Sequence, residues 1–501
     1  MKHKNFTTIF VQAAQMLLAV MLTLGTQTAW AQSTMQFPIY TGDEGTSEKP
    51  YQIKTTDDLN KLAADVNSGT TYANTYFKMT ADIAYTYTMA WNDDNSTENN
   101  YTAIGCKLSN NDEDDHPFEG TFDGDGHTVS GIRIYKGGSD QFSNSYQGLF
   151  GYMRQGTVKN VTLSDANITG YGNVGGIVGR QQSGTIENCL VIGTRVNRTS
   201  YNGARGAIVG YSLNLGSGST LKYNYYSNCI MGDTPTASGI GCNGADVTEN
   251  DGAVPATILS EIAAVPTPLS GTVVFRRSFT ANVASTICLP FAYTPATGIG
   301  TFYEFAGVNA EKTEVTMQDA NITADNPLEA NKPYLFKPAA TGPVLFHGTA
   351  AATISAGKTP TTGNTDGWVF KGTYARINWP DDPQTIYGFA APGKADLAEG
   401  KFFRVKGGSN SYVLPFRAYL QYSGTSGARA VTRGGTEDLP ETMTVRFIDA
   451  VGTPTAIGTL NTRTGEVVFG DAWYSLDGRR IQGQPTKKGI YINNGYKIII
   501  K

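Results

Sequence analysis

A glycine-bounded phrase recurs three times in the first half of the chain. It reads Gly-Leu-Phe-Gly at 148–151, Gly-Gly-Ile-Val-Gly at 175–179 and Gly-Ala-Ile-Val-Gly at 206–210. The first two copies end 28 positions apart, and the third ends 31 positions after the second. A companion phrase at 156–160 returns at 184–188, again after 28 positions. This regular spacing predicts a solenoid in which each repeat forms one coil.

Apolar residues alternate within each repeat, while glycine and asparagine punctuate them. Val158, Val161 and Leu163 show the pattern, which is typical of short strands separated by tight turns. We therefore expect a right-handed parallel β-helix with three strands in each coil. One coil cannot bury its own apolar face, so roughly three or more must stack, and about four are visible in the sequence.

Aligning the repeats predicts which residues stack on one another. The glycines that recur are Gly148, Gly151, Gly175, Gly179, Gly206 and Gly210. Two apolar columns are expected, Val129 with Val158, Ile186 and Tyr226, and Ile132 with Val161, Cys189 and Cys229. A corner ladder of residues that tolerate left-handed backbone is expected at Gly131, Asn160, Asn188 and Asn228.

The cysteines leave two readings of the second column. Five cysteines cannot form a complete set of intramolecular disulfides. Neighbouring coils are about 4.8 Å apart, which brings Cys189 and Cys229 within bridging distance if they stack. Parallel side-chain directions in a stack favour a reduced, buried pair instead.

A short helix is expected ahead of the first strands. Thr55 and Asp58 stand at capping-box spacing, and apolar residues follow with helical periodicity at Leu59, Leu62, Ala63 and Val66. The open end of a solenoid needs a cover. The position favours a cap over an ordinary surface helix.

The N-terminus has the features of a signal peptide. Lys2 and Lys4 precede an apolar stretch at about 9–24, and Ala-Trp-Ala at 29–31 predicts cleavage before Gln32. No later apolar run approaches the roughly 20 residues of a membrane helix. The 39 basic and 43 acidic residues form no basic block, which argues against a nucleic-acid partner.

Composition divides the chain further. We expect a signal peptide at 1–31, the capped β-helix at 32–250 and a proline-containing linker at 251–270. Short Val-, Phe- and Tyr-rich segments at 271–420 predict an antiparallel β-sandwich. A polar linker at 421–442 then leads to a small β module at 443–501, in which Asn494-Gly495 predicts a hairpin turn.

Two parts of the chain resemble known bacterial modules. The glycine phrases, with Phe-Glu-Gly-Thr-Phe-Asp-Gly at 118–124 upstream, resemble the GLUG-motif β-helix of bacterial surface proteins. The closing segments at 473–480 and 489–492 are similar to the short C-terminal module of exported Bacteroidales proteins. The resemblance implies a cell-surface or secreted protein, often adhesin-like, whose C-terminal module serves in sorting or attachment. The third repeat departs from the pattern, since Ala207 replaces a bulky residue and an insertion precedes Asn228.

Catalytic and metal motifs are sparse. His116, His127 and His347 stand beside no recognisable nucleophile motif, which disfavours a hydrolase with a catalytic triad. Asp123 and Asp125 could supply oxygen ligands to Ca²⁺. Their Asp-Gly pairs are also what a tight turn requires, and the turn is the preferred interpretation. We expect no metal and no cofactor.

Charged and aromatic residues of the coils could serve a ligand. A polysaccharide lyase or hydrolase needs a basic residue or paired carboxylates in one groove, and the basic residues spread over the coils are Arg154, Lys159, Arg180, Arg195, Arg198 and Arg205. Aromatic side chains can stack on sugars or anchor protein partners. The aromatic candidates are Tyr223, Tyr225, Tyr226, Trp368 and Trp379.

These features favour an exported, non-enzymatic, adhesin-like protein whose β-helix face binds an extracellular glycan or a surface protein. A carbohydrate-active β-helix enzyme is the first alternative, and convergent charges in one groove would distinguish it. A purely structural surface component is the second.

Overall fold

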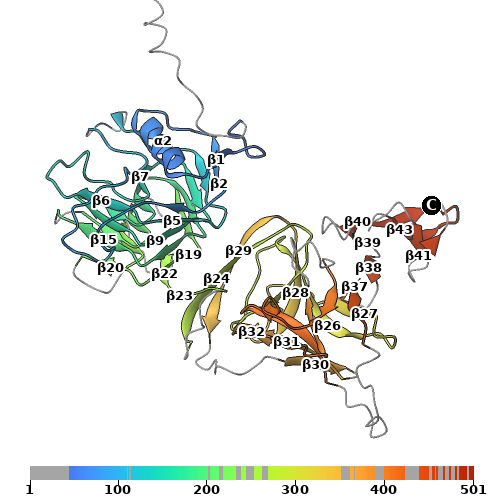
Figure 1. The fold of residues 1–501 in the computed structure, drawn as a ribbon. Coiled ribbons are helices and arrows are strands. Elements are labelled where there is room, and N and C mark those ends of the chain that lie inside the picture. Colours follow the sequence, from blue (N-terminus) through green and yellow to red (C-terminus); the bar gives the residue numbers. More distant parts are fainter. Residues whose placement is uncertain are drawn as a thin grey trace, which may run out of the picture.

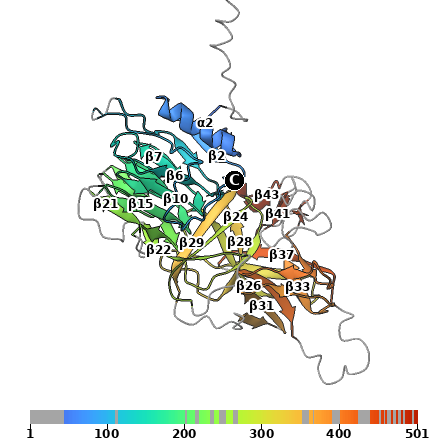
Figure 2. The same ribbon diagram turned by 60° about the vertical axis from the view of Figure 1, so that its left-hand side comes forward.

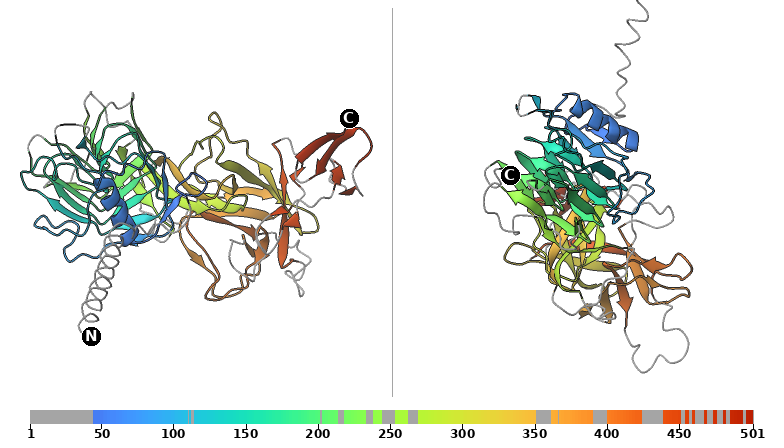
Figure 3. Two further views of the ribbon diagram at one scale, coloured as in Figure 1. Left: turned by 90° about the horizontal axis from the view of Figure 1, so that it is seen from above. Right: turned by 90° about the vertical axis from the view of Figure 1, so that its left-hand side faces the viewer.

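The computed structural model describes residues 44–109, 111, 114–200, 203–213, 218–232, 238–243, 253–261, 269–350, 361–365, 367–389, 400–423 and 439–450, and short segments between 454 and 500. A stack of parallel coils, a β-sandwich and a small C-terminal sheet follow one another along the molecule (Figures 1 and 3). The predicted all-β class with one cap helix is confirmed. The predicted signal peptide and most of the polar linker lie outside the described residues.

One full coil shows how the β-helix is built. Its strands are β8 (Thr157–Lys159), β9 (Thr162–Ser164), β10 (Asn167–Gly170), β11 (Val174–Gly175) and β12 (Val178–Gln181). The next coil repeats them as β13 (Gly184–Glu187), β14 (Leu190–Ile192), β15 (Arg195–Arg198), β16 (Arg205–Gly206) and β17 (Val209–Ser212). Each strand pairs in parallel with its counterpart. The coil therefore has four principal strands and a short fifth, rather than three, because the chain bends within the glycine phrase itself.

The coils stack into four principal sheets. Sheet I has the order β1-β2-β4-β8-β13-β18, and sheet II has β22-β19-β14-β9-β5-β3. Sheet III is β20-β15-β10-β6, and sheet IV is β21-β17-β12-β7. The strands not yet bounded are β1 (Tyr51–Ile53), β2 (Tyr76–Met79), β3 (Ile83–Ala84), β4 (Thr121–Asp123), β5 (Thr128–Ser130), β6 (Arg133–Lys136), β7 (Phe150–Met153), β18 (Ser219–Lys222), β19 (Asn224–Ser227), β20 (Ile230–Met231), β21 (Ile240–Asn243) and β22 (Ala253–Pro255).

The register of the paired strands shows that the first predicted apolar column is wrong, because its members lie in two different sheets. Val158 and Ile186 are stacked in sheet I. Val129 and Tyr226 lie in sheet II, in a column completed by Leu163 and Val191. The strands of both sheets carry the same alternation of apolar and polar residues, so alignment of the phrases could not tell them apart.

The second predicted column also divides between two corners. Leu190 N donates to Val161 O, which places Val161 and Cys189 between sheets I and II. Cys229 lies at the next corner, where Ile230 N donates to Thr194 O. Both cysteines are free and do not stack on each other. Burial raises the pKa of the Cys189 thiol to about 12 and that of Cys229 to about 11.

The asparagine ladder is likewise shorter than the alignment predicts. Asn160 and Asn188 share a corner, both at φ +56°, and Asn188 Nδ2 donates to Asn160 Oδ1 at 3.3 Å. Asn160 Nδ2 in turn donates to Asp123 Oδ1 at 2.9 Å. Gly131 and Asn228 have the predicted left-handed backbone but lie at the corner between sheets II and III. The ladder is thus Asp123, Asn160 and Asn188.

At several repeat glycines, other backbone atoms lie so close that a side chain would not fit. A Cβ at Gly151 would lie 2.3 Å from Gly105 O, and one at Gly175 would lie 2.1 Å from Val178 O. Gly105 O belongs to the neighbouring coil and Val178 O to the same glycine phrase, and neither backbone atom can swing aside as a side chain does. The short strands of the glycine phrase therefore stack only when these positions lack a side chain.

Helix α2 (Thr56–Asn67) begins where the sequence predicts. Asp58 N donates to Thr55 Oγ1 at 3.2 Å, and Thr55 N donates to Asp58 Oδ2 at 3.0 Å, which completes the capping box. The apolar side chains of α2, at Leu59, Leu62, Ala63 and Val66, join the core of the coils. The helix covers one end of the stack (Figure 2), as a cap must.

The sandwich is built from a short sheet and a long one. The short sheet is β23 (Thr257–Leu259), β24 (Gly271–Phe279) and β29 (Gly342–Ala350). The long sheet has the order β25-β28-β26-β27-β37-β34-β33-β36-β31-β30. Its strands are β25 (Ser285–Cys288), β28 (Pro333–Pro338), β26 (Gly300–Val308), β27 (Glu314–Asp319), β37 (Thr442–Ile448), β34 (Phe402–Arg404), β33 (Ile386–Phe389), β36 (Arg417–Tyr422), β31 (Trp368–Thr373) and β30 (Thr361–Thr365).

Two apolar clusters fill the sandwich. Phe275 and Phe346 of the short sheet pack with Phe302 and Phe336 of the long one. A second cluster contains residues from both halves of the long sheet, among them Met317 and Phe370. Strand β37 falls within the segment predicted as the C-terminal module, yet it pairs with β27 and β34 in the sandwich.

The β24–β29 ribbon joins the sandwich to the β-helix. Val274 and Leu345 pack against Leu190 and Tyr225 of sheet II. Arg276 reaches the same sheet, where its Nη1 donates to Thr162 Oγ1 at 2.7 Å and its Nη2 donates to Asn188 O. Burial lowers the pKa of Arg276 to about 10. The two domains therefore share a packed interface.

The chain crosses this interface without leaving extended structure. Strand β22 belongs to sheet II, and β23 begins two residues after it ends, pairing in parallel with β24. The intervening Ala256 N donates to Tyr226 O at 2.9 Å. These strands lie within the segment predicted as a linker at 251–270.

The C-terminal sheet is antiparallel, in the order β42-β41-β43-β44. Its strands are β41 (Trp473–Ser475), β42 (Arg480–Ile481), β43 (Gly489–Asn493) and β44 (Tyr496–Ile500). Asn493 pairs with Tyr496, so β43 and β44 form a hairpin. The turn residues Asn494 and Gly495 lie outside the described residues.

Candidate functional site

The five aromatic residues singled out in the sequence are divided between the β-helix and the sandwich. Tyr225 and Tyr226 are buried, and Tyr223 stacks on His347 of the sandwich with ring centroids 4.6 Å apart. Trp368 is buried in the sandwich core, and Trp379 packs edge-on against another aromatic, Tyr419. The structure does not bring these side chains together on one open surface.

Asp123 and Asp125 are engaged by neighbouring protein groups. Lys159 Nζ lies 3.3 Å from Asp123, and Lys78 Nζ lies 3.1 Å from Asp125. Asp125 N also donates to Asp123 Oδ1 at 2.9 Å, as in a turn. Within the described ranges, no three His, Cys, Asp or Glu side chains are grouped so that they could hold a metal ion.

The basic residues of the coils are distributed over several sheets. Arg154 pairs with Glu119 at 2.7 Å, and Lys159 pairs with Asp123 on sheet I. Arg195 is buried on sheet III. The remaining three are engaged locally, Arg180 with the rings of Tyr146, Tyr152 and Tyr211, Arg198 with Ser200 O, and Arg205 with Asn197 Oδ1. They do not converge on one groove.

The three histidines outside the predicted signal peptide are also held by nearby groups. His116 Nδ1 lies 2.6 Å from Asn67 O, and His127 Nδ1 lies 3.2 Å from Asp82 Oδ1. His347 sits among three tyrosine rings at the interface of the two domains, those of Tyr223, Tyr225 and Tyr293. Burial lowers the pKa of His347.

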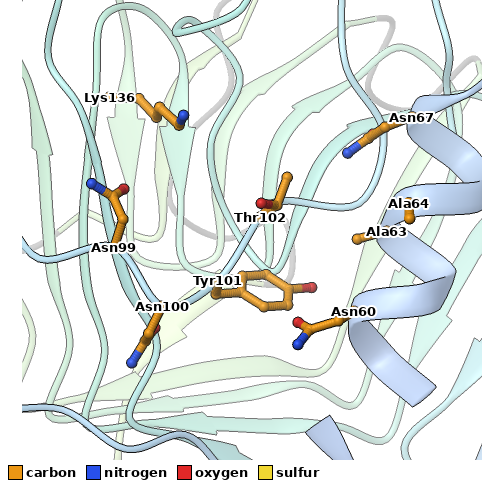
Figure 4. A pocket seen from close by; sticks show the side chains of 9 residues that line it. All are labelled: Asn60, Ala63, Ala64, Asn67, Asn99, Asn100, Tyr101, Thr102 and Lys136. Atoms are coloured by element: carbon orange, nitrogen blue, oxygen red, sulfur yellow. The ribbon is translucent and has the colours of Figure 1, made fainter. Parts of the chain in front are cut away.

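A cavity of about 510 Å³ lies between α2 and the segment at 99–102. Its size is within the range of small-molecule sites. Residues of α2 form one wall, Asn99 and Lys136 stand opposite, and Tyr101 and Thr102 lie between (Figure 4). The lining residues are Asn60, Ala63, Ala64, Asn67, Asn99, Asn100, Tyr101, Thr102 and Lys136.

Two of the lining asparagines are part of the framework. Asn67 Nδ2 donates to Ala103 O at 3.0 Å, and its Oδ1 accepts from Gly105 N at 2.8 Å. Asn100 Nδ2 donates to Thr86 O and Gly131 O, and its Oδ1 accepts from a third backbone group, the N–H of Arg133. These amides bind α2 and the segment at 99–102 to the coils and fix the walls of the cavity.

The other polar side chains that line the cavity have hydrogen-bond donors available to a ligand. Asn60 Oδ1 accepts from Tyr85 OH at 2.9 Å, while its Nδ2 makes no hydrogen bond to the described residues. Asn99 Oδ1 accepts from Tyr135 N at 2.7 Å, and its Nδ2 makes one 3.3 Å bond to Thr97 O. Lys136 is exposed and pairs with no acidic side chain of the described part of the chain. The site can therefore donate hydrogen bonds from several directions.

No motif in the sequence points directly to this cavity. Its helical wall uses Asn60, Ala64 and Asn67, which recur at i, i+4 and i+7 on a more polar face beside the core residues of α2. That polar face could have drawn attention to α2. Asn99, Thr102 and Lys136 are brought to it only by the stacking of coils, which no local pattern encodes.

The comparisons with known proteins match parts of the chain only. No protein-family model matches it. Halomucin from Haloquadratum walsbyi is 38% identical over 171 residues, which make up 34% of this chain and 2% of Halomucin. A solved structure of a candidate immunoglobulin A1 protease from Bacteroides ovatus is 17% identical, covering 43% of this chain and 66% of that one with a TM-score of 0.25. At that score, the likeness does not bear on function.

A search of the described residues for a helix long and apolar enough to span a membrane finds none.

Proposed function

We propose that the protein is exported through its signal peptide, cleaved at Ala31–Gln32, and acts at the cell surface or outside the cell as a non-enzymatic, adhesin-like binder of glycans. The β-helix supplies the binding surface. The sandwich is a spacer, and the module at 443–501 serves in sorting or attachment.

The cavity beside α2 is the single observation that carries this proposal. Its lining offers amide, hydroxyl and ammonium groups around small apolar side chains, without a carboxylate or an imidazole among them. Such a lining suits hydrogen bonding to a hydroxyl-rich ligand. It offers no pair of carboxylates for hydrolysis of a glycosidic bond. The GLUG-like repeats and the N-terminal segment support the extracellular setting.

The proposal is tested with purified protein and a panel of immobilised host and plant polysaccharides. Retention of the protein and release of new reducing or unsaturated chain ends are measured together. We expect retention without new chain ends, and we expect Asn60→Leu to weaken retention because it removes an available donor and fills part of the cavity.

Two other outcomes would replace the proposal. New chain ends that disappear when Arg180 or Arg198 is substituted would indicate the carbohydrate-active enzyme. Neither retention nor cleavage on any polysaccharide would leave a structural role or a protein partner, which a pull-down with surface proteins would then separate.

A further inference from the structure

In the cavity beside α2, more hydrogen-bond donors than acceptors are left for a ligand. The Oδ1 atoms of Asn60, Asn67, Asn99 and Asn100 each accept an internal hydrogen bond. Tyr101 OH donates to Leu149 O at 2.9 Å and is buried. The groups left for a ligand are therefore mainly donors, namely Asn60 Nδ2, Asn99 Nδ2, the Thr102 hydroxyl and the Lys136 ammonium.

Lys136 gives this donor set a charge. It is the one charged residue among the nine that line the cavity. Other lysines of the β-helix have an acidic partner, as Lys78 has Asp125 and Lys159 has Asp123. In Figure 4 the Lys136 side chain extends from its wall toward the space in front of α2. A positive site without a counter-charge favours an anionic ligand.

The walls limit what kind of anion fits. A bare inorganic ion would occupy a small part of about 510 Å³. Ala63 and Ala64 give the helical wall small apolar side chains, and the Tyr101 ring lies between the two walls (Figure 4). A ring-sized ligand can lie against these surfaces while its oxygens accept bonds from the surrounding donors.

We propose that this cavity binds an acidic sugar, a pyranose whose carboxylate or sulfate meets Lys136 while its hydroxyl and ring oxygens accept from Asn60, Asn99 and Thr102. The inference rests on the proposed glycan-binding function and specifies its ligand class. A neutral sugar would leave the Lys136 ammonium without an anionic partner, so the site should bind it more weakly than an acidic sugar.

The test is calorimetric titration of the purified protein with three oligosaccharides of equal length, an oligogalacturonide, a sulfated galactose oligosaccharide and a neutral galactose oligosaccharide. We expect at least one acidic ligand to bind about tenfold more tightly than the neutral one, as one charge-assisted bond implies. The two acidic arms distinguish carboxylate from sulfate. Raising the salt concentration should weaken the acidic interaction.

Two variants locate the effect. Lys136→Gln should reduce affinity for the acidic ligand about tenfold and leave the neutral one unchanged. Lys488→Gln removes an exposed lysine just before β43, far along the chain from the cavity, and should change neither. Thermal unfolding verifies that both variants are folded.

The outcomes separate the two proposals. Equal affinity for neutral and acidic sugars, or full acidic affinity in Lys136→Gln, would overturn the acidic-sugar site and leave glycan binding standing. Failure of all three sugars to bind, together with no retention on the polysaccharide panel, would overturn both.

Discussion

Asn160 shows how one residue can satisfy two demands of a coil corner. Its backbone is left-handed at φ +56°, and its side chain links Asp123 in one coil to Asn188 in the next. Asparagine tolerates this backbone better than other side-chain-bearing residues do. The ladder therefore stabilises both the turn and the stacking of coils.

Substitution can separate these two contributions. Asn160→Ala should lower the free energy of unfolding by about 2 kcal/mol, because it loses both the backbone tolerance and the ladder bonds. Asn160→Gly keeps the backbone tolerance and should cost about 1 kcal/mol. Urea denaturation measures both. Equal losses in the two variants would mean that the left-handed backbone contributes little.

At the scale of single elements, glycine positions and helix ends determine how the coils close. The short strands of the glycine phrase stack through backbone contacts that leave no room for a Cβ. At the end of the stack, α2 contributes its apolar face to the same core. Packing along the stack and closure of its end are thus separate requirements on the sequence.

Gly151→Ala tests the first requirement. The new Cβ would lie 2.3 Å from Gly105 O and 2.6 Å from Tyr146 O. We expect a loss of about 3 kcal/mol in the free energy of unfolding, the upper range for overpacking. Gly138→Ala is the matched control, since its Cβ would meet only the Asn144 side chain at 3.1 Å. A Gly151→Ala variant as stable as the control would contradict the packing argument.

Thr55→Ala tests the second requirement. Loss of the N-cap hydroxyl should destabilise α2 by about 1 kcal/mol, whereas Thr55→Ser should retain the bond. Amide hydrogen exchange would report about fivefold faster exchange in α2 if the helix opens locally. Unchanged exchange in the alanine variant would show that packing of Leu59 and Leu62 alone holds the helix.

These elements also show where sequence reasoning reaches its limit. The repeat period, the capping box at Thr55 and the terminal hairpin follow from local chemistry, and the structure has each of them. The assignment of Val129 and Tyr226 to their column depends on pairing between coils. Neighbouring strands share one alternation pattern, so this pairing could not be predicted from the pattern alone.

The cavity beside α2 likewise could not be predicted from the local sequence pattern. Asn60 and Lys136 are 76 positions apart in sequence and approach only because coils and cap are stacked. The surroundings of the aromatic candidates likewise depend on tertiary packing. Tyr223, for example, contacts His347 from the sandwich.

At the scale of the whole molecule, we expect His347 to make the domain interface sensitive to acid. Burial lowers its pKa in the folded protein, so the unfolded chain takes up the proton at higher pH. The stability that depends on a neutral His347 is therefore fully present above about pH 6.5 and is lost as the pH falls below that value. The facing groups are Tyr223, Tyr225 and Tyr293, with Lys222 over the Tyr223 ring, and none is an acid that could neutralise an imidazolium.

We expect the melting temperature to drop between pH 7.5 and pH 5.5, and we expect His347→Gln to show a smaller drop. Calorimetry across this range measures both. An undiminished drop in His347→Gln would assign the acid sensitivity to other groups.

The extended run from β22 through Ala256 to β23 has a mechanical consequence. Hydrogen bonds hold the chain to sheet II on one side of Ala256 and to β24 on the other, so the junction has no free hinge at this point. Arg276 and the apolar contacts with Leu190 brace it laterally. A force applied to the sandwich would therefore be transmitted to the coils without bending at this point, and a rotation of one domain would rotate the other.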